Sequence, residues 1–320
     1  MKFSRQTTLR SHVTVTGVGV HSGSAVKLTL GPADVDAGFV FIRTDREGPG
    51  RKVSAEAGAV VATELATVLG TQEGPLVSTA EHVLAALRGM GVDNATIEVD
   101  GPEVPIMDGS AAPFVAAIDR AGIRELSAPR RFIEVLKPVQ VSRGESFGEL
   151  RPYAGGFRTE VEICFANPLI GRQSFNFDLS PESFRRDIAR ARTFGCMDDV
   201  EQLLNAGYAR GASLDNSVVF SADRLLNPEG LRYVDECVRH KVLDVVGDLA
   251  LAGLPLIGLY RSVRGGHRLN HAVLSALMAD RSAWRVVEAE PMVRRAARGH
   301  AEVVGGLLGG MVPVYGPDVS

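Results

Sequence analysis

Apolar residues recur at every second position in several short segments of the first half of the chain, and this alternation predicts β-strands. These segments are residues 12–23, 25–33, 38–45 and 94–101. Residues 78–91 and 110–122 instead place apolar side chains three or four positions apart, which predicts two helices. The motif Ser78-x-x-Glu81 matches a capping box and predicts that the first of these helices begins there.

The second half of the chain repeats this order of strands followed by helices. Strands are predicted near residues 132–141, 148–153, 159–165 and 255–263, and helices near 181–191 and 237–250. Strands that precede helices in both halves favour two α+β domains over a strict βαβ alternation. We expect domains at residues 1–124 and 131–285, with a linker in the charged, proline-containing segment 122–132. Residues 286–320 lack clear periodicity and form a tail to which the sequence assigns no role.

Composition limits the class of protein. The chain has 320 residues, 45% hydrophobic and 23% charged, as is ordinary for a soluble globular protein, and its length favours two domains. A net charge of −3 gives no basic field that would favour a nucleic-acid partner. The longest apolar run, 249–260, is broken by glycine and proline and is too short to span a membrane. Three scattered cysteines imply no disulfide framework, and we expect a cytoplasmic monomer without a secretory signal.

The predicted helix at 237–250 carries an unusual stack of polar residues. His240, Asp244 and Asp248 are four residues apart, so they lie on one side of an otherwise apolar helix. A solvated face, an internal ion-pair network and a metal site would each explain the stack, since unpaired carboxylates are costly in apolar surroundings. Two ligands one turn apart converge, but a zinc hydrolase needs about three protein ligands and an open position.

Two histidines elsewhere could complete such a site. His82 lies in the first turn of an apolar helix, directly after Glu81; alternatively, Glu81 completes the capping box and His82 is a satisfied core histidine. His267 follows two glycines and could equally be an ordinary loop histidine. Together, His82, His240 and Asp244 could hold zinc, Glu81 could take a proton from the attacking water, and His267 could protonate a leaving group. This combination is typical of metal-assisted hydrolysis.

Longer strings of sequence carry a resemblance to a known family. They are GVGVHSG at 17–23, STAEHVLAAL at 78–87, DNATIEVDGPEVPIMDGSAAPF at 93–114, LRYVDECVRHKVLDVVGDLALAG at 231–253 and GGHRLN at 265–270. From about residue 3 to 285 the chain resembles the UDP-3-O-acyl-N-acetylglucosamine deacetylases, zinc amidases of lipid A biosynthesis in Gram-negative bacteria. The resemblance implies hydrolysis of the N-acetyl group of UDP-3-O-acyl-N-acetylglucosamine. It also implies two similar α+β domains, each a sheet layered on helices, with the active site at their interface.

The resemblance also assigns roles to individual residues. It implies one catalytic Zn²⁺ per chain held by His82, His240 and Asp244, a ligand set that also tolerates iron(II). Further roles follow for Glu81 as general base, His267 as general acid, Asp248 as the carboxylate supporting His267, Thr193 near the carbonyl oxygen, and Lys241 near the diphosphate. Because Lys241 directly follows His240, a helix would point it about 100° away from the metal.

An insert near residues 192–216 is implied to build a tunnel for the acyl chain of the substrate. We expect the substrate to meet Phe194, Val200, Leu203 and Leu204, although ordinary packing of a short helix would also explain the last three. The chain departs from the family pattern at Cys196, where an aromatic residue is expected, and at Gly266, where serine is frequent.

Two other functions compete with this interpretation. The first is a zinc hydrolase of the same fold that acts on a different acylated sugar nucleotide. The second is a binding protein without enzyme activity that retains the scaffold. The intact set of an acid, a base and three ligands argues against the second, because binding alone gives no reason to keep them.

Overall fold

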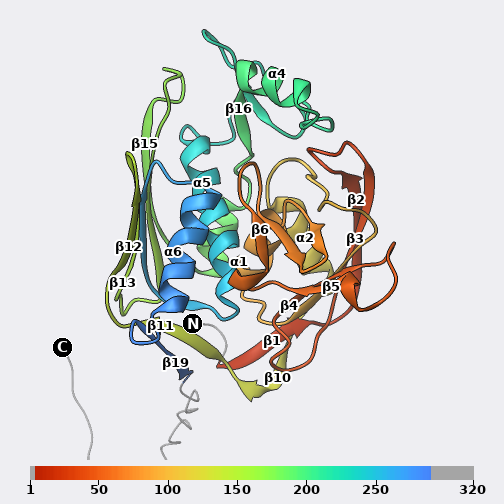
Figure 1. Ribbon diagram of the computed structural model, residues 1–320, viewed down its shortest axis with the longest axis vertical. Helices are drawn as coiled ribbons and strands as arrows, with labels where there is room; N and C mark the ends of the chain where they lie inside the picture. Colours follow the sequence, from red (N-terminus) through yellow and green to blue (C-terminus); the bar gives the residue numbers. More distant parts are fainter. Residues whose placement is uncertain (1–3, 290–320) are drawn as a thin grey trace, which may run out of the picture. The chain divides into compact units, whose positions relative to one another are not determined.

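A layer of helices lies between two β-sheets in the computed structural model, which describes residues 4–289 (Figure 1). The first half of the chain supplies a five-stranded sheet in the order β2-β3-β9-β4-β5. Its strands are β2 (Val13–Val18), β3 (Ala25–Gly31), β4 (Phe39–Arg43), β5 (Lys52–Ser54) and β9 (Ala95–Val99). Helix α2 (Ala112–Ala121) packs against β2, and α1 (Glu81–Gly89) packs against α2. The alternating segments therefore form one sheet with helices on its inner face.

The second half supplies a seven-stranded sheet. Its strands are β11 (Arg131–Val135), β12 (Val139–Arg143), β13 (Ser146–Arg151), β14 (Phe157–Cys164), β15 (Arg172–Asp178), β18 (Leu256–Val263) and β19 (Trp284–Glu288). Strand β18 lies inside this sheet, antiparallel to β13 and parallel to β14 and β11. Helix α6 (His267–Ala279) packs on β12 and β13, and α5 (Glu236–Leu249) packs on β14 and β15. Side chains along α5 and at the N-terminal end of α6 approach the start of α1, where Asp244 lies near His82 and His267 lies near Glu81.

Helices α1 and α5 pack closely against each other, so that the apolar residues of both halves join in one hydrophobic core. All nine residues of α1 are buried, and so are most of those of α5. At Gly247 the two backbones nearly touch, because a Cβ atom there would collide with the carbonyl oxygen of Glu81. The absence of a side chain at Gly247 thus allows α5 to lie beside the first turn of α1.

Smaller elements surround these layers. Strand β1 (Arg5–Leu9) pairs with β10 (Ile123–Pro129), and β6 (Val60–Ala62), β7 (Val68–Thr71) and β8 (Gly74–Val77) form a three-stranded sheet. Strands β16 (Phe194–Cys196) and β17 (Val218–Phe220) pair in parallel around helix α4 (Met197–Asn205). A short α3 (Pro181–Ser183) leads into a π-helical turn, Phe184–Ile188. Among the described residues, no helix combines the length and the apolar character needed to cross a membrane.

The α+β class predicted from the sequence is confirmed, and helices and strands occur at the predicted segments. The predicted linker, residues 122–132, is not an irregular connection, because most of it forms β10 and pairs with β1. Strand β19 extends the large sheet into the predicted tail as far as Glu288, by pairing with β11. Residues 290–320 of that tail lie outside the described residues. The domain boundaries stay a prediction.

Candidate active site

Helices α1 and α5 bring three of the predicted residues together in the interior. His82, His240 and Asp244 are 3%, 2% and 2% exposed, and each offers one ligand atom within 4.8 Å of the others. Asp244 Oδ1 lies 3.3 Å from His240 Nε2 and 3.8 Å from His82 Nε2. The possibility of a solvated face is thereby excluded, since these side chains are buried. The His-His-Asp set predicted from the sequence is a possible metal site.

The hydrogen bonding of this set fits a bound cation. Asp244 Oδ1 and His82 Nδ1 are buried without a hydrogen-bond partner among residues 4–289, so His82 is not the satisfied core histidine of the alternative interpretation. His240 Nδ1 lies 3.0 Å from the carbonyl oxygen of Ala191, to which it can donate, and its Nε2 is left facing Asp244. A buried carboxylate oxygen without a donor is costly, and a metal ion would remove that cost.

Electrostatics keep these ligands in the protonation states that metals require. Burial and, to a lesser extent, the neighbouring His240 lower the pKa of His82 to about 3, so the His82 imidazole is neutral. Burial alone would raise the pKa of Asp244, but the adjacent His240 and Lys241 outweigh it and hold the carboxyl well below its usual range. Two neutral imidazoles and one carboxylate therefore face a common point.

Glu81 does not cap the helix that it begins. The residue before α1 is Ala80, and no side chain caps this helix, so the predicted capping box is wrong. The carboxylate of Glu81 instead accepts a hydrogen bond at Oε2 from the backbone N–H of Thr67, 3.0 Å away. Burial, opposed by His267, raises the pKa of Glu81 to about 7. A carboxylate with such a pKa is suited to proton transfer near neutral pH.

His267 is the first residue of α6, whereas the alternative interpretation placed it in a loop. Its Nδ1 lies 2.9 Å from Asp248 Oδ2, and its Nε2 lies 3.7 Å from Glu81 Oε1. Burial would lower the pKa of His267, but the nearby carboxylates, Asp248 first among them, outweigh it and raise the pKa to about 10. The pairing expected between Asp248 and His267 is present.

Two residues that the sequence analysis missed also bind Asp248. Thr67 Oγ1 donates to Asp248 Oδ1 over 2.6 Å, and Asn270 Nδ2 donates to Asp248 Oδ2 over 2.8 Å. Asn270 in turn accepts a hydrogen bond from the hydroxyl of Tyr260. The three-residue spacing from His267 to Asn270 on one helix is a sequence signal that was available. Thr67 has no such signal, because it lies far from its partners in the sequence.

Lys241 was predicted to point away from the metal ligands, and this is wrong. Its Nζ lies 2.8 Å from Asp244 Oδ2 and 5.5 Å from the centre of the Phe194 ring. The four-carbon stem bends back toward the residue three positions later, which a helical projection of Cβ directions does not capture. Only 23% of the side chain is exposed, so Lys241 is not a freely solvated lysine either.

The segment that precedes β16 lies beside His240. The carbonyl of Ala191 meets the His240 ring, and the buried Arg192 forms an ion pair with Glu236 of α5 over 2.9 Å. Thr193 is fixed by its backbone, since its N–H donates to the carbonyl of Gly109 over 2.8 Å. The ring of Phe194 then stands edge-to-face with His240, with 6.3 Å between centres. The functions predicted for Thr193 and Phe194 stay predictions.

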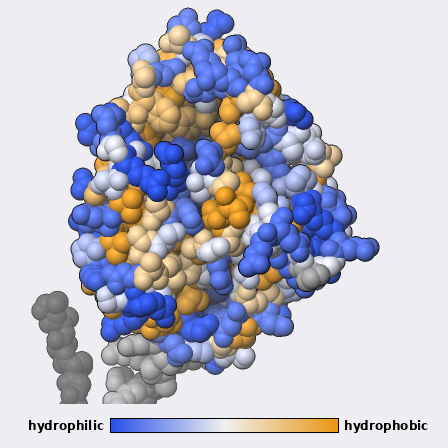
Figure 2. Space-filling model, in the orientation of Figure 1, coloured by the Kyte–Doolittle hydropathy of each residue, from blue (hydrophilic) through white to orange (hydrophobic). Residues whose placement is uncertain are grey.

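Helix α4 leaves its apolar side chains largely uncovered. None of its residues is buried; Leu204 is 48% exposed, and Val200 and Leu203 are partly exposed. Figure 2 shows apolar surface in the upper part of the molecule, where α4 and β16 lie. Other exposed apolar side chains are Met197 on α4, Tyr208 and Leu214 after it, and Phe165 and Leu169 between β14 and β15. Cys196, the departure noted in the sequence, is half-buried at the end of β16.

A cavity of about 420 Å³ lies next to these elements. Its wall runs from Ala66, the neighbour of Thr67, to Tyr208 beyond the end of α4. His21 also lines it, and the His21 ring stands edge-to-face with that of Tyr208, with 5.9 Å between centres. The cavity is thus lined both by the two neighbours of Thr67, Ala66 and Val68, and by two residues that follow α4, Gly207 and Tyr208.

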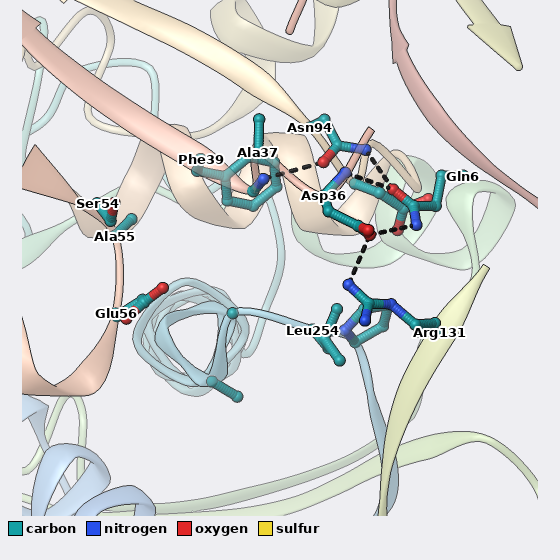
Figure 3. A pocket seen from close by; sticks show the side chains of 15 residues that line it. Gln6, Asp36, Ala37, Phe39, Ser54, Ala55, Glu56, Asn94, Arg131 and Leu254 are labelled. Atoms are coloured by element: carbon teal, nitrogen blue, oxygen red, sulfur yellow. Dashed lines mark hydrogen bonds and ion pairs between the residues drawn. The ribbon is translucent and has the colours of Figure 1, made fainter. Parts of the chain in front are cut away.

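A second cavity, of about 220 Å³, lies where β1 and β11 meet the turn after β3 (Figure 3). Its polar side chains satisfy one another: Gln6 Nε2 donates to Asp36 Oδ1 over 2.7 Å, and Asn94 Nδ2 donates to Gln6 Oε1. Arg131 of β11 forms an ion pair with Asp36. The Arg131–Asp36 ion pair connects the two halves of the chain. Unlike the set of His82, His240 and Asp244, the described residues that line this cavity have no buried polar side-chain atom without a hydrogen-bond partner.

Comparisons with known proteins identify relatives along nearly the whole of this chain. The family model described as UDP-3-O-acyl N-acetylglycosamine deacetylase matches residues 6–279. Proteins of Brucella ovis, Brucella canis and Brucella melitensis, each named UDP-3-O-acyl-N-acetylglucosamine deacetylase, are 50% identical to it over 285 residues. The aligned part covers 89% of this chain and 99% of each relative.

Proposed function

Because the chain belongs to the UDP-3-O-acyl N-acetylglycosamine deacetylase family, we propose that it hydrolyses the N-acetyl group of UDP-3-O-acyl-N-acetylglucosamine in lipid A biosynthesis. Water adds to the acetyl carbon, the amide C–N bond breaks, and acetate and UDP-3-O-acyl-glucosamine are released. The observation that carries this proposal is the buried His82, His240 and Asp244 set, with Glu81 and His267 beside it.

We assign the metal site to one Zn²⁺ per chain. Two imidazole nitrogens and one carboxylate oxygen are a common zinc ligand set, and iron(II) accepts the same ligands. A cation bound there would act as a Lewis acid toward the amide carbonyl and the attacking water. The unpaired Oδ1 of Asp244 supports this assignment, since that buried oxygen has no donor among the described residues.

Glu81 and His267 divide the proton transfers. Glu81, whose pKa is raised to about 7, accepts the proton that the attacking water gives up. His267, whose pKa is raised to about 10, stays protonated at neutral pH and donates from Nε2 to the nitrogen that leaves. Environments that push two pKa values apart in this way are typical of an acid and base pair. The 3.7 Å between His267 Nε2 and Glu81 Oε1 lets both act on one amide group.

Thr193, Lys241 and Phe194 are proposed to bind the substrate around the reacting amide. The loop that carries Thr193 also places the Ala191 carbonyl on His240, which brings the threonine close to the cluster. Asp244 outweighs the effect of burial and raises the pKa of Lys241, so its ammonium group stays charged. Such a positive charge is suited to binding a diphosphate. The edge-to-face contact between the Phe194 and His240 rings supports a position of Phe194 beside the substrate.

The 3-O-acyl chain is assigned to the apolar surface of α4. Val200, Leu203 and Leu204 lie on a helix without buried residues, so their apolar faces are available to a ligand. The cavity lined by Tyr208, just beyond this helix, is also lined by Ala66 and Val68, the neighbours of Thr67. Leu204→Asp should lower kcat/KM for long acyl chains more than for short ones. Equal losses for all chain lengths would contradict this assignment.

The test of the proposed function is release of acetate by the purified protein. We expect a chelator to abolish release and added Zn²⁺ to restore it. His240→Ala should lose both metal and activity, whereas His12→Ala, at an exposed histidine, should keep both. A protein that releases no acetate when loaded with either metal would refute the function. A His240→Ala variant with unchanged metal affinity would show that His240 is not a ligand.

A further inference from the structure

Thr67 binds both helices of the buried cluster at once. It is 2% exposed and directly precedes β7. Its backbone N–H donates to Glu81 Oε2 over 3.0 Å, and its carbonyl accepts from the N–H of Ala80 over 3.2 Å. Its hydroxyl donates to Asp248 Oδ1 over 2.6 Å. One residue next to β7 therefore contacts the start of α1 and the end of α5.

Each of these bonds leaves a particular oxygen available to His267. Because Thr67 occupies Oε2 of Glu81, Oε1 is the oxygen that lies 3.7 Å from His267 Nε2. Because it occupies Oδ1 of Asp248, Oδ2 is left to pair with His267 Nδ1 at 2.9 Å. Thr67 thus orients both carboxylates that face the two nitrogens of one imidazole.

The direction of the hydroxyl bond is fixed by chemistry. An ionised carboxylate has no proton to give, so the Thr67 hydroxyl must be the donor. Its 2.6 Å length is that of a charge-assisted O–H···O⁻ bond, the stronger kind. A β-branched side chain has few χ1 rotamers, so the hydroxyl is held in place by the residue's own stiffness.

We propose that Thr67 is a positioning residue for the deacetylation: it fixes the general acid relative to the general base through Asp248. This rests on the proposed function, since it assigns the reaction to Glu81 and His267. Without the hydroxyl, Asp248 Oδ1 is buried without its donor, and the carboxylate turns toward the donors that remain. His267 turns with it, and a displacement of about 1 Å in a reacting group can cost about 100-fold in rate.

Three variants separate the hydroxyl from the rest of Thr67. Thr67→Val keeps the shape and the backbone N–H but removes the hydroxyl, whereas Thr67→Ser keeps the hydroxyl. Thr159→Val is the matched control, because Thr159 is fully buried on β14 and its Oγ1 has no hydrogen-bond partner in the described part of the chain. All three are assayed with their metal content, kcat and KM measured.

We expect Thr67→Val to lower kcat about 10- to 100-fold with unchanged KM and full metal content, since it removes a hydrogen bond to a charged group. Thr67→Ser should stay within about threefold of the parent, and Thr159→Val should match it. In a double-mutant cycle, adding Thr67→Val to Asp248→Asn should cost little more than Asp248→Asn alone, because the two act as a unit.

Two results of the kinetic assay would overturn the proposal. The first is a normal kcat in Thr67→Val, and the second is an equal loss of kcat in Thr67→Ser, which would indicate packing rather than the hydroxyl. A readout without activity separates this from the proposed function: the proton NMR signal of His267 Nδ1–H, assigned by its loss in His267→Ala. It should move in Thr67→Val but not in Thr159→Val. A parent protein that releases no acetate would refute the function, and an unmoved signal would refute the positioning by Thr67.

Discussion

Replacing Asp248 by asparagine removes a buried negative charge beside the imidazole of His267 while keeping the size of the side chain. Asp248 Oδ2 lies 2.9 Å from His267 Nδ1, and Asp248 is only 1% exposed, so solvent screens the pair weakly. The charge of Asp248 is the largest of the carboxylate effects that raise the pKa of His267 to about 10, against the effect of burial. Its removal should therefore lower the pKa of His267.

The size of this change follows from the geometry. Two unit charges about 4 Å apart interact by about 4 kcal/mol at an effective dielectric constant of about 20. At about 1.4 kcal/mol per pKa unit, this energy corresponds to about 3 units, and opposite charges in contact typically shift a pKa by about 1 to 3 units. Because protonated His267 is the acid, activity falls when it loses its proton. The basic limb of the pH profile should move about 2 to 3 units toward lower pH in Asp248→Asn.

The assay is the pH dependence of kcat/KM for acetate release, which reports the groups of the free enzyme. Metal content and melting temperature are measured on the same samples, because an amide at position 248 cannot accept from all three of its present donors. Asp93→Asn is the matched control, since Asp93 is also buried and also accepts from Thr7 and Arg130, away from the cluster. It should lose stability without any shift of the basic limb.

An unmoved basic limb in a folded, metal-loaded Asp248→Asn protein would refute the assignment of that limb to His267 supported by Asp248. A shift of the same size in Asp93→Asn would also refute it, because the effect would then follow from lost stability and not from the charge beside the acid.

Three further changes test other parts of the site. Glu81→Gln should lower kcat about 10²- to 10⁴-fold with metal still bound, because the amide keeps an acceptor for Thr67 but cannot take a proton; near-normal turnover would exclude Glu81 as the base. Lys241→Ala should raise KM for the nucleotide substrate and reduce its salt dependence, and unchanged values would limit this lysine to its contact with Asp244. Gly247→Ala should destabilise the fold by about 1 to 3 kcal/mol, because its Cβ meets the carbonyl of Glu81; an unchanged melting temperature would contradict this close approach.

The sequence indicated the parts of the site that depend on local spacing and residue type. His240 and Asp244 converge because residues four apart on a helix are neighbours. The prediction of a capping box was wrong because the Glu81 carboxylate accepts a hydrogen bond from the N–H of Thr67 and not from the N-terminus of its own helix. Local sequence patterns predict hydrogen bonds between residues close in the sequence. Such predictions are wrong where a buried donor from another part of the chain binds the same acceptor.

Other features depend on contacts that sequence order does not reveal. Thr67 is joined to two helices by hydrogen bonds to Glu81 and Asp248, and no spacing along the chain encodes this position. The same holds for the pairing of β10 with β1, which joins segments more than a hundred residues apart. The reach of Lys241 was missed because a helical projection gives the direction of a Cβ atom and not the end of a flexible stem.

The division of the cluster between α1 and α5 also has a consequence for protein synthesis. His82 leaves the ribosome about 160 residues before His240, and at about 5 to 20 residues per second this is a delay of roughly 8 to 30 seconds. Throughout that interval α1 has no α5 to pack against, and the nascent chain holds only one of the three ligands. An interrupted translation product that ends before α5 therefore lacks two of the three ligands and has no catalytic activity. Deacetylase activity thus indicates that synthesis has continued beyond α5.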